Sequence, residues 1–499
     1  MIPLQPSRAE FARLAAPGIN VIPVWTEIVA DGETPVSAFA KLGGEPPSIL
    51  LESAEQNDQI GRFSFLGFGA RALISARGHQ VEITRDGDTR SFETPSDPFA
   101  ELEALMKSYH VAGGEDLPGF HGGAVGYLSY DAVRWFEPTI PNHPKDELGV
   151  PDMFFMVAGN VLIFDHKKRR IKIVVNAFFG ENDRDAAYDH AAQEISRILS
   201  LLKQPLALTP LFTGAQHGMP ETRSNTTEEE YHEMVRRAQE YIRAGDIFQM
   251  VPAQRFETDF DRDALDLYRA LRFINPSPYM FCVRCPDGQS LVGSSPEVHV
   301  RVTNRLVEIR PIAGTRRRGE TPNEDVANAE DLLADPKERA EHLMLVDLAR
   351  NDVGRIAEFG SVRVSDFMTI ERYSHVMHIV SHVSGRLAGG RNAYDVMRAT
   401  FPAGTVSGSP KVRAMQIINE LEKSKRCTYA GAVGYFGFDG DLDSCIALRT
   451  VLLKNKKAYV QAGGGVVADS TPEGEYQESV NKAMAAMRAI AHASQAPSE

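Results

Sequence analysis

The chain has 499 residues, of which 43% are hydrophobic and 24% are charged, and its formal net charge is −13. A chain of this length can bury a sizeable core, and its acidic balance argues against a nucleic-acid or anionic-membrane surface, which would need a basic face. The four cysteines lack ligand spacing, which predicts reduced thiols. There is neither a signal-peptide pattern nor an apolar run long enough to span a membrane, so we expect a cytoplasmic protein.

Residues 1–205 are predicted to form an N-terminal region of short strands and turns. A helix-like stretch at 183–203 closes this region, and the polar, proline-containing segment 206–225 predicts a linker. The remaining part, 226–490, alternates amphipathic helices with strands. The strand-like runs of the N-terminal region are 48–52, 161–164 and 171–175.

Start signals predict three helices in the second part. Thr227 and the acidic residues after it open a helix through 244, where Gly245 ends it. Asp335-Pro336 and Thr471-Pro472 each combine an N-cap residue with a proline at the first helical position. These helices should extend to about 351 and 491. The predicted strands are 248–256, 279–284, 299–302, 362–367, 376–383, 429–436, 444–453 and 458–463, which favours largely antiparallel sheets flanked by helices.

Two pairs of glutamates stand near the starts of the second and third of these helices. Glu338 and Glu341 are three residues apart, as are Glu475 and Glu478, so each pair shares one helix face. Two such clusters brought together would repel each other, and a hard dication such as Mg²⁺ would remove that cost. The alternative is that both are solvated acidic faces near helix N-termini.

Two loops are rich in small residues and backbone amides. The segment TFPAGTVSGSPK, 400–411, is suited to an anion nest, although it lacks P-loop spacing and an ordinary turn is the alternative. The segment QAGGGVVADS, 461–470, follows a strand, and its three glycines would let backbone N–H groups approach a ligand closely. A β-bulge is the alternative there.

Three single residues carry polar groups in unusual contexts. Arg449 lies in the apolar run SCIALRTVLL, where a charge is either paired in the core or binds a ligand. His378 alternates with apolar residues, which is typical of a satisfied structural histidine but also compatible with a catalytic one. Glu297 follows the turn GSSP and would present a carboxyl group at a strand start.

Long motifs along the chain resemble those of the chorismate-utilising enzymes, and within that family the large, chorismate-binding subunit of anthranilate synthases. In the N-terminal region the matching stretches are LLES and GGAVGYLSYD. The resemblance implies an α+β fold of two large antiparallel β-sheets packed face to face with helices outside, in which the N-terminal region is interleaved with a catalytic domain at 226–490. The other matching stretches are AGDIFQMVP, NPSPYMF, LVGSSPE, PIAGTRRRG, AEHLMLVDLARND, MHIVSHVSG, FPAGTVSGSPKVRAM, YAGAVGYFG, ALRT and QAGGGVVADSTPEGEYQES.

The resemblance also implies roles for single residues. Glu341 and Glu478 would hold Mg²⁺, with Glu338 and Glu475 supporting them. Glu297 would be the general acid that protonates the departing C4 hydroxyl of chorismate, and His378 the base that takes the C2 proton. The residues implied to contact the substrate are Thr405, Tyr429, Arg449, Gly463, Gly464, Gly465, Ala313, Gly314 and Thr315.

Two positions choose between members of the family. Relatives that add water to chorismate carry a lysine in place of Gln249, whereas ammonia needs no such base. Relatives that make 4-amino-4-deoxychorismate usually carry a nucleophilic lysine in place of Ala313. The resemblance therefore favours amination at C2 and release of anthranilate. The alternatives are 4-amino-4-deoxychorismate synthase and a non-catalytic regulatory protein that binds an aromatic amino acid.

The same resemblance implies regulation and a partner. The feedback site for tryptophan would use Glu52, Ser53, Pro278, Tyr279 and Met280. No glutaminase segment with a nucleophilic cysteine and its histidine is visible in the sequence. We therefore expect a separate glutamine amidotransferase subunit that delivers ammonia, and hence a hetero-oligomer.

Overall fold

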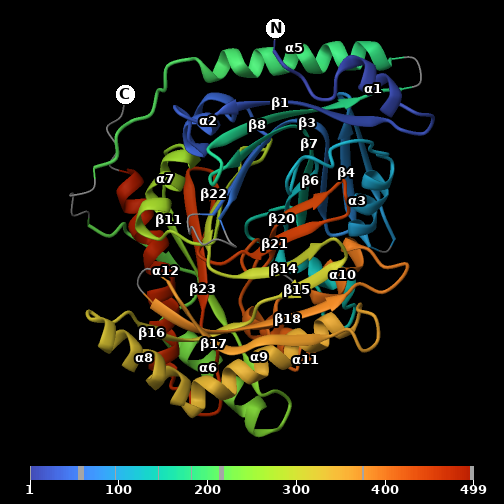
Figure 1. Cartoon of the computed structure of the whole chain (residues 1–499). Helices are drawn as coiled ribbons and strands as arrows, with labels where there is room; N and C mark the ends of the chain where they lie inside the picture. The colour runs from blue at the N-terminus through green and yellow to red at the C-terminus, as the bar shows by residue number, and fades with distance from the viewer. Residues whose placement is uncertain are drawn as a thin grey trace.

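A computed structural model describes residues 2–53, 61–95, 97–143, 145–180, 183–212, 218–373 and 376–494 (Figure 1). Twenty-one strands in these ranges are hydrogen-bonded into one continuous sheet, and two short strands form a second one. The elements of the N-terminal region are α1 (Arg8–Leu14), β1 (Val21–Val29), α2 (Pro35–Leu42), β2 (Ser48–Glu52), β3 (Phe63–Arg77), β4 (Gln80–Arg85), β5 (Asp88–Glu93), α3 (Pro98–Lys107), β6 (Gly123–Leu128), η1 (Tyr130–Ala132), α4 (Val133–Phe136), β7 (Met153–Asp165), β8 (Arg170–Phe178) and α5 (Arg184–Leu202).

The second part adds helices at the opposite end of the molecule from α5: Figure 1 shows α6, α8 and α9 there. Its elements are β9 (Arg223–Ser224), α6 (Glu228–Arg243), β10 (Gln249–Met250), β11 (Ala253–Asp259), α7 (Ala264–Ile274), β12 (Tyr279–Arg284), β13 (Ser290–Ser295), β14 (Val298–Thr303), β15 (Leu306–Ile309), β16 (Ile312–Arg317), α8 (Pro322–Ala334), α9 (Pro336–Gly354), β17 (Arg363–Arg372), β18 (Val376–Arg386), α10 (Ala393–Thr400), η2 (Gly404–Val406), β19 (Gly408–Ser409), α11 (Lys411–Leu421), β20 (Ala432–Gly437), β21 (Leu442–Ile446), β22 (Thr450–Lys454), β23 (Lys457–Gly463) and α12 (Pro472–Ser494).

Strands from the two parts of the chain pair with each other. β2 lies antiparallel to β12, with Leu51 opposite Phe281, and β6 lies antiparallel to β20, with Tyr127 opposite Val433. Even the segment predicted as a linker takes part, because β9 pairs with β11. The ladders of β2 with β12 and of β6 with β20 place residues that are more than 200 positions apart in the sequence next to one another.

The core confirms the predicted α+β fold, in which layers of antiparallel sheet pack face to face. One apolar cluster lies between β6 and β7 on one side and β12, β13 and β22 on the other, and includes Tyr127, Phe154, Phe281 and Leu452. Two further clusters join the outer faces of the strands to helices, chiefly α5, α7 and α12 in one cluster and α3, α9 and α10 in the other. Burial of these apolar faces is the main force that holds the layers together.

The predicted helix starts are confirmed. Thr227 and Glu230 form a capping box at the start of α6, and the Asp335 carboxylate accepts from the N–H groups of Lys337 and Glu338 at the start of α9. At the start of α12 the Thr471 hydroxyl accepts from the Gly474 N–H at 3.2 Å. These caps satisfy N–H groups that a helix leaves without partners, and so fix where the glutamate pairs stand.

Three predicted strands are wrong in part. The run 248–256 is split into β10 and β11, because Pro252 between them has no N–H for a ladder. The run 429–436 becomes a strand only from Ala432, and 444–453 is broken between β21 and β22. The cause in both is left-handed backbone, at Ala430 (φ 62°) and Arg449 (φ 47°), which an extended strand does not contain. No described helix is long and apolar enough to cross a membrane.

Candidate active site

The two glutamate pairs stand on α9 and α12, and the structure brings them within electrostatic reach of each other. Burial raises the pKa of Glu341, and the negative charges of Glu338, on its own helix, and Glu478, on α12, raise it further. Burial and the charge of Glu478 likewise raise the pKa of Glu475. Carboxyl groups that share a site disfavour one another's ionised form. The arrangement is therefore a concentrated negative site rather than two solvated helix faces.

The donor set fits a hard dication. Glu475 Oε2 is buried, and no group in the described part of the chain hydrogen-bonds to it. A Cβ atom on Gly464 would lie 2.4 Å from that oxygen and 3.4 Å from Glu478 Oε1, so glycine is what leaves room for both carboxylates. A buried carboxylate oxygen without a partner is costly, and oxygen ligands are those that Mg²⁺ prefers.

Donor groups of the chain itself, two cations and one hydroxyl, contact three of these carboxylates. Lys482, which the sequence argument missed, donates to Glu478 Oε1 at 2.7 Å and to the Gly463 carbonyl at 3.1 Å. Arg316 lies 3.5 Å from Glu338, and Ser470 donates to Glu475 at 2.7 Å. Lys482 stands four residues after Glu478, a helical spacing that could have pointed to it.

The donor atoms of the four predicted glutamates lie farther apart than those of one other group of possible metal ligands. Within the described ranges, the one set of at least three His, Cys, Asp or Glu donor atoms lying within 4.8 Å of one another is Glu228, His232 and Glu473. Both glutamates of that set are exposed. Among the predicted glutamates, Glu478 pairs with Lys482 and Glu338 with Arg316, so a bound dication would compete with both cations for the same oxygens.

Glu297 lies between β13 and β14 and faces the loop that carries Thr405. The Thr405 hydroxyl donates to Glu297 Oε1 at 3.0 Å. Burial raises the pKa of Glu297 to about 8, although the Thr405 bond and the charge of Lys482 act in the opposite direction. The carboxyl group is therefore protonated at neutral pH and available as an acid.

His378 lies on β18, opposite the PIAGT segment of β16. Its Nδ1 donates to the Gly314 carbonyl at 2.7 Å, with the Thr315 hydroxyl 3.2 Å from the same nitrogen. Because a carbonyl only accepts, the neutral ring carries its proton on Nδ1 and leaves Nε2 able to accept one. Burial lowers the pKa of His378, and the nearby charge of Arg449 lowers it further, so the ring is neutral at pH 7. The structure thus favours a base over a purely structural histidine.

Arg449 is mostly buried and sits in left-handed backbone between β21 and β22. Burial lowers its pKa, and no carboxylate among the described residues compensates that burial. The core salt bridge that the sequence left open is therefore wrong. A buried, unpaired guanidinium suits a bidentate bond to the carboxylate of a ligand, and backbone outliers of this kind concentrate at functional sites.

Tyr429 and the glycine loop lie on the α12 side of the site. Burial raises the pKa of Tyr429 to about 12, so it stays protonated and can donate a hydrogen bond. A Cβ on Gly463 would lie 2.1 Å from the Pro252 carbonyl, and one on Gly465 would lie 2.6 Å from Gln249 Nε2. Glycine is therefore required at both positions by close approach to other atoms of this chain, whereas approach of the loop to a ligand stays a prediction.

Gln249 and Ala313, the two positions that choose between reactions, both border this site. The Gln249 side chain hydrogen-bonds to Glu341, and Gln249 pairs with Ser409 between β10 and β19. Ala313 is buried on β16 beside Gly314, whose φ of 67° and close approach to Glu338 require glycine. Neither position offers a basic or nucleophilic group.

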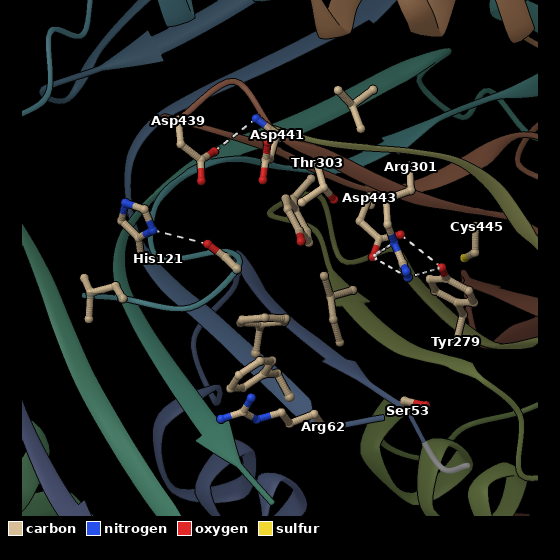
Figure 2. Close-up of a pocket in the computed structure, with 18 of the residues that line it drawn as sticks. Ser53, Arg62, His121, Tyr279, Arg301, Thr303, Asp439, Asp441, Asp443 and Cys445 are labelled. Carbon is tan, nitrogen blue, oxygen red and sulfur yellow. Dashed lines mark hydrogen bonds and ion pairs between the residues drawn. The ribbon is translucent and has the colours of Figure 1, made fainter. Parts of the chain in front are cut away.

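A separate cavity of about 770 Å³ lies where β2 meets β12. All five residues predicted for tryptophan, Glu52, Ser53, Pro278, Tyr279 and Met280, line it. In its wall, Tyr279 donates to Asp443 at 3.0 Å and accepts from Arg301 at 2.9 Å (Figure 2). The Glu52 carboxylate is already used, since it accepts from Tyr268 at 2.7 Å and pairs with Arg272 at 2.7 Å. Glu52 therefore shapes the cavity rather than offering a free charge.

Comparison with known proteins agrees with this geometry. The model of the chorismate binding enzyme family matches residues 46–488. Anthranilate synthase component 1 of Pseudomonas putida is 47% identical, over 98% of this chain and 99% of that protein. The crystal structure of anthranilate synthase component I from Streptococcus pneumoniae is 38% identical, with a TM-score of 0.75 over 92% of this chain and 99% of that one.

A more distant structure supports the fold alone. The menaquinone-specific isochorismate synthase MenF from Escherichia coli is 17% identical, with a TM-score of 0.69 over 97% of this chain and 98% of that one. The full-length matches confirm the resemblance that the sequence motifs carry. This chain belongs to the family of chorismate binding enzymes.

Proposed function

We propose that the chain is the large subunit of an anthranilate synthase, which aminates chorismate at C2 with ammonia and then releases pyruvate. The observation that carries the proposal is the unpaired, buried Arg449, which lies near the neutral His378 in a site that also holds acidic groups. Chorismate is a dicarboxylate, so a site for it needs both a guanidinium clamp and a way to offset the charge of the second carboxylate.

Glu297 and His378 suit the two proton transfers of this reaction. Glu297, protonated at neutral pH, donates to the C4 hydroxyl, which leaves as water while ammonia bonds to C2. His378 Nε2 then accepts the C2 proton as the bond to the enolpyruvyl oxygen breaks and the ring becomes aromatic. Thr405 orients the acid, and Gly314 and Thr315 orient the base. Opposite shifts of the two pKa values are what separate acid from base roles.

The remaining residues bind and orient the substrate. Arg449, Tyr429 and the backbone at Gly463, Gly464 and Gly465 would hold the enolpyruvyl carboxylate. Glu341 and Glu478, supported by Glu338 and Glu475, would hold Mg²⁺ against the ring carboxylate. When bound, the ion supplies positive charge that offsets the glutamates and the substrate carboxylate together.

Amination at C2 is favoured because residue 249 offers no base to activate water and residue 313 offers no nucleophile. Gln249 hydrogen-bonds to Glu341 and leaves ammonia as the attacking group. The alternative is 4-amino-4-deoxychorismate synthase, which Ala313 disfavours. We therefore expect purified chain, chorismate, Mg²⁺ and ammonium to give anthranilate and pyruvate in equal amounts by chromatography. If 4-amino-4-deoxychorismate accumulates instead, the alternative holds, and isochorismate would refute the role given to Gln249.

We also infer feedback inhibition by tryptophan at the cavity beside β2 and β12. The support is that Ser53, Pro278, Tyr279 and Met280 all line the same cavity. Two strand pairings connect this cavity with Glu297 in the active site. Tyr279 pairs with Ser295, which stands two residues before Glu297. Cys445, which also lines the cavity, pairs with Val298, the residue after Glu297. A ligand that orders β12 would therefore change the position of Glu297, the proposed general acid.

A separate amidotransferase subunit is the third part of the proposal. The names of the relatives describe them as one component of a synthase. We further propose the division into 1–205, 206–225 and 226–490, with the catalytic residues in the last part and the tryptophan cavity shared by the first and last. The shared ladders of β2 with β12 and β6 with β20 support that interleaving.

A further inference from the structure

The segment 426–431, here called the Tyr429 loop, has a backbone that its own residues do not favour. Cys427 and Ala430, on either side of Tyr429, both lie in the left-handed region, with φ of 54° and 62°. Residues with a Cβ enter this region at a cost in free energy, so such a conformation persists only where surrounding contacts determine it. The contacts that hold the loop should therefore be identifiable.

The first set of contacts comes from the motif GYLSYD, nearly 300 residues earlier. Asp131 Oδ2 accepts from the Cys427 N–H at 2.7 Å. The Cys427 carbonyl accepts from the Ser129 hydroxyl at 2.7 Å and from the Tyr130 N–H at 2.9 Å. Ser129 and Asp131 are 1% and 4% exposed, so these bonds are shielded from water. Both backbone groups of the strained Cys427 are thus fixed by the N-terminal region.

The second set comes from Arg426, which is 3% exposed. Its guanidinium donates to the Val406 carbonyl at 2.8 Å and to the Val251 carbonyl, and it pairs with Glu422. The Glu422 carboxylate in turn accepts from the Ala253 N–H at 2.9 Å. The same guanidinium lies over the Tyr130 ring, 4.6 Å from its centroid, and 5.6 Å from that of Tyr429.

These contacts join three segments that carry substrate-facing residues. Val251 follows Gln249 by two positions, Val406 follows Thr405 by one, and Tyr429 is three positions after Arg426. We propose that Arg426 and Asp131 are positioning residues that lock the Tyr429 loop and fix Gln249, Thr405 and Tyr429 relative to one another. The proposal rests on the function proposed above, and it gives the GYLSYD motif a role in the active site.

Paired substitutions test the proposal without leaving a buried charge unpaired. Arg426→Met combined with Glu422→Gln removes both charges of the first buried pair. Asp131→Leu combined with Arg134→Met removes the acceptor of the Cys427 N–H together with the charge that pairs with it. Each variant is compared with the wild-type chain for kcat and KM with chorismate, Mg²⁺ and ammonium, below its own unfolding temperature. We expect KM for chorismate to rise and kcat to fall, with kcat/KM lower by about 100-fold, as small displacements of catalytic groups cause.

Two controls separate positioning from general stability. Arg134→Met removes the ion pair of Arg134 with Asp131 Oδ1 but keeps the bond to Cys427, and Arg398→Met removes a remote pair with Asp97 and Glu103. Both controls should lower Tm and leave kcat and KM unchanged. Folded variants of Arg426 and Asp131 with wild-type kcat and KM would overturn the proposal.

Failure to fold and failure of the proposed function have separate readouts. If the variants above do not fold, Arg426→Lys keeps a charge beside Glu422 but offers fewer, less rigid donors, and its kcat/KM should still fall. A wild-type value in Arg426→Lys would then overturn the proposal. Absence of anthranilate with the wild-type chain would instead refute the function on which the proposal rests.

Discussion

At the scale of single residues, the site is defined by groups whose pKa is shifted by burial from that of the free amino acid. The pKa of Glu297 is raised, so it is protonated at neutral pH, whereas the pKa values of His378 and Arg449 are lowered, which leaves His378 neutral. Burial is the main cause in all three, and it acts in opposite directions on an acid and on a base. Burial in the same site therefore keeps Glu297 protonated as an acid and His378 neutral as a base at neutral pH.

The pH dependence of turnover should therefore show two limbs. On the acid side, kcat/KM falls as His378 becomes protonated, below the ordinary histidine pKa because its own pKa is lowered. On the basic side, activity falls as Glu297 loses its proton around pH 8. Glu297→Gln should lower kcat by about 10²- to 10⁴-fold, the usual contribution of a general acid. An unchanged basic limb in the pH profile of that variant would assign the limb to another group.

Arg449 should determine binding more than chemistry. Arg449→Met removes a charged hydrogen-bond donor, and such bonds contribute about 1.5–3 kcal/mol, so KM for chorismate should rise by about 10- to 100-fold. Arg449→Lys should recover only part of that loss, because lysine lacks the planar fork. Steady-state kinetics decide this, and a KM unchanged in both variants would remove Arg449 from the clamp.

At the scale of elements, the sequence predicts regular segments better than strained ones. The capping residues Thr227, Asp335 and Thr471 mark three helix starts correctly, because a cap depends on neighbours in sequence. The breaks at Ala430 and Arg449 were not predictable, because the contacts that hold left-handed backbone come from segments distant in the sequence, such as the Ala447 carbonyl that accepts from the Ala430 N–H. Lys482 was missed although its spacing from Glu478 was visible.

The glycine loop between β23 and α12 offers a test of the metal site. Gly464→Ala places a Cβ where Glu475 Oε2 now lies, so the carboxylate must move while the backbone need not. We expect the Mg²⁺ concentration for half-maximal activity to rise by about 10- to 100-fold, as for other changes next to metal ligands. Gly354→Ala at the end of α9 meets no atom within 4 Å and serves as the matched control. Equal Mg²⁺ dependence in both variants would contradict the assignment of Glu475.

At the scale of the whole molecule, neither site belongs to one part of the chain. The cavity proposed to bind tryptophan needs β2 and β12, and the Tyr429 loop needs the GYLSYD motif, so both form only when the N-terminal region pairs with the later strands. The family resemblance implied this interleaving, whereas composition and periodicity alone would have suggested two separate units. Long-range antiparallel pairing is not visible in local patterns.

Tryptophan should act on the molecule as a whole. At 100 times its Kd it adds about 2.7 kcal/mol to the stability of the folded state, so Tm should rise while anthranilate formation falls. Ser53→Phe fills part of the cavity at a distance from the catalytic residues, and it should remove both effects without loss of basal activity. Tryptophan that changes neither Tm nor rate in the wild-type chain would refute the regulatory site.

The most direct test of the whole account is the nitrogen source that supports turnover. Anthranilate fluorescence is followed with the purified chain, chorismate and Mg²⁺, with either ammonium or glutamine as the nitrogen donor. Ammonium should support anthranilate formation and glutamine should not, because the proposed site is built to bind chorismate, whereas release of ammonia from glutamine is assigned to a proposed partner subunit. No anthranilate with ammonium, with or without the partner, would contradict the account, and glutamine-dependent turnover by the chain alone would contradict its need for a partner.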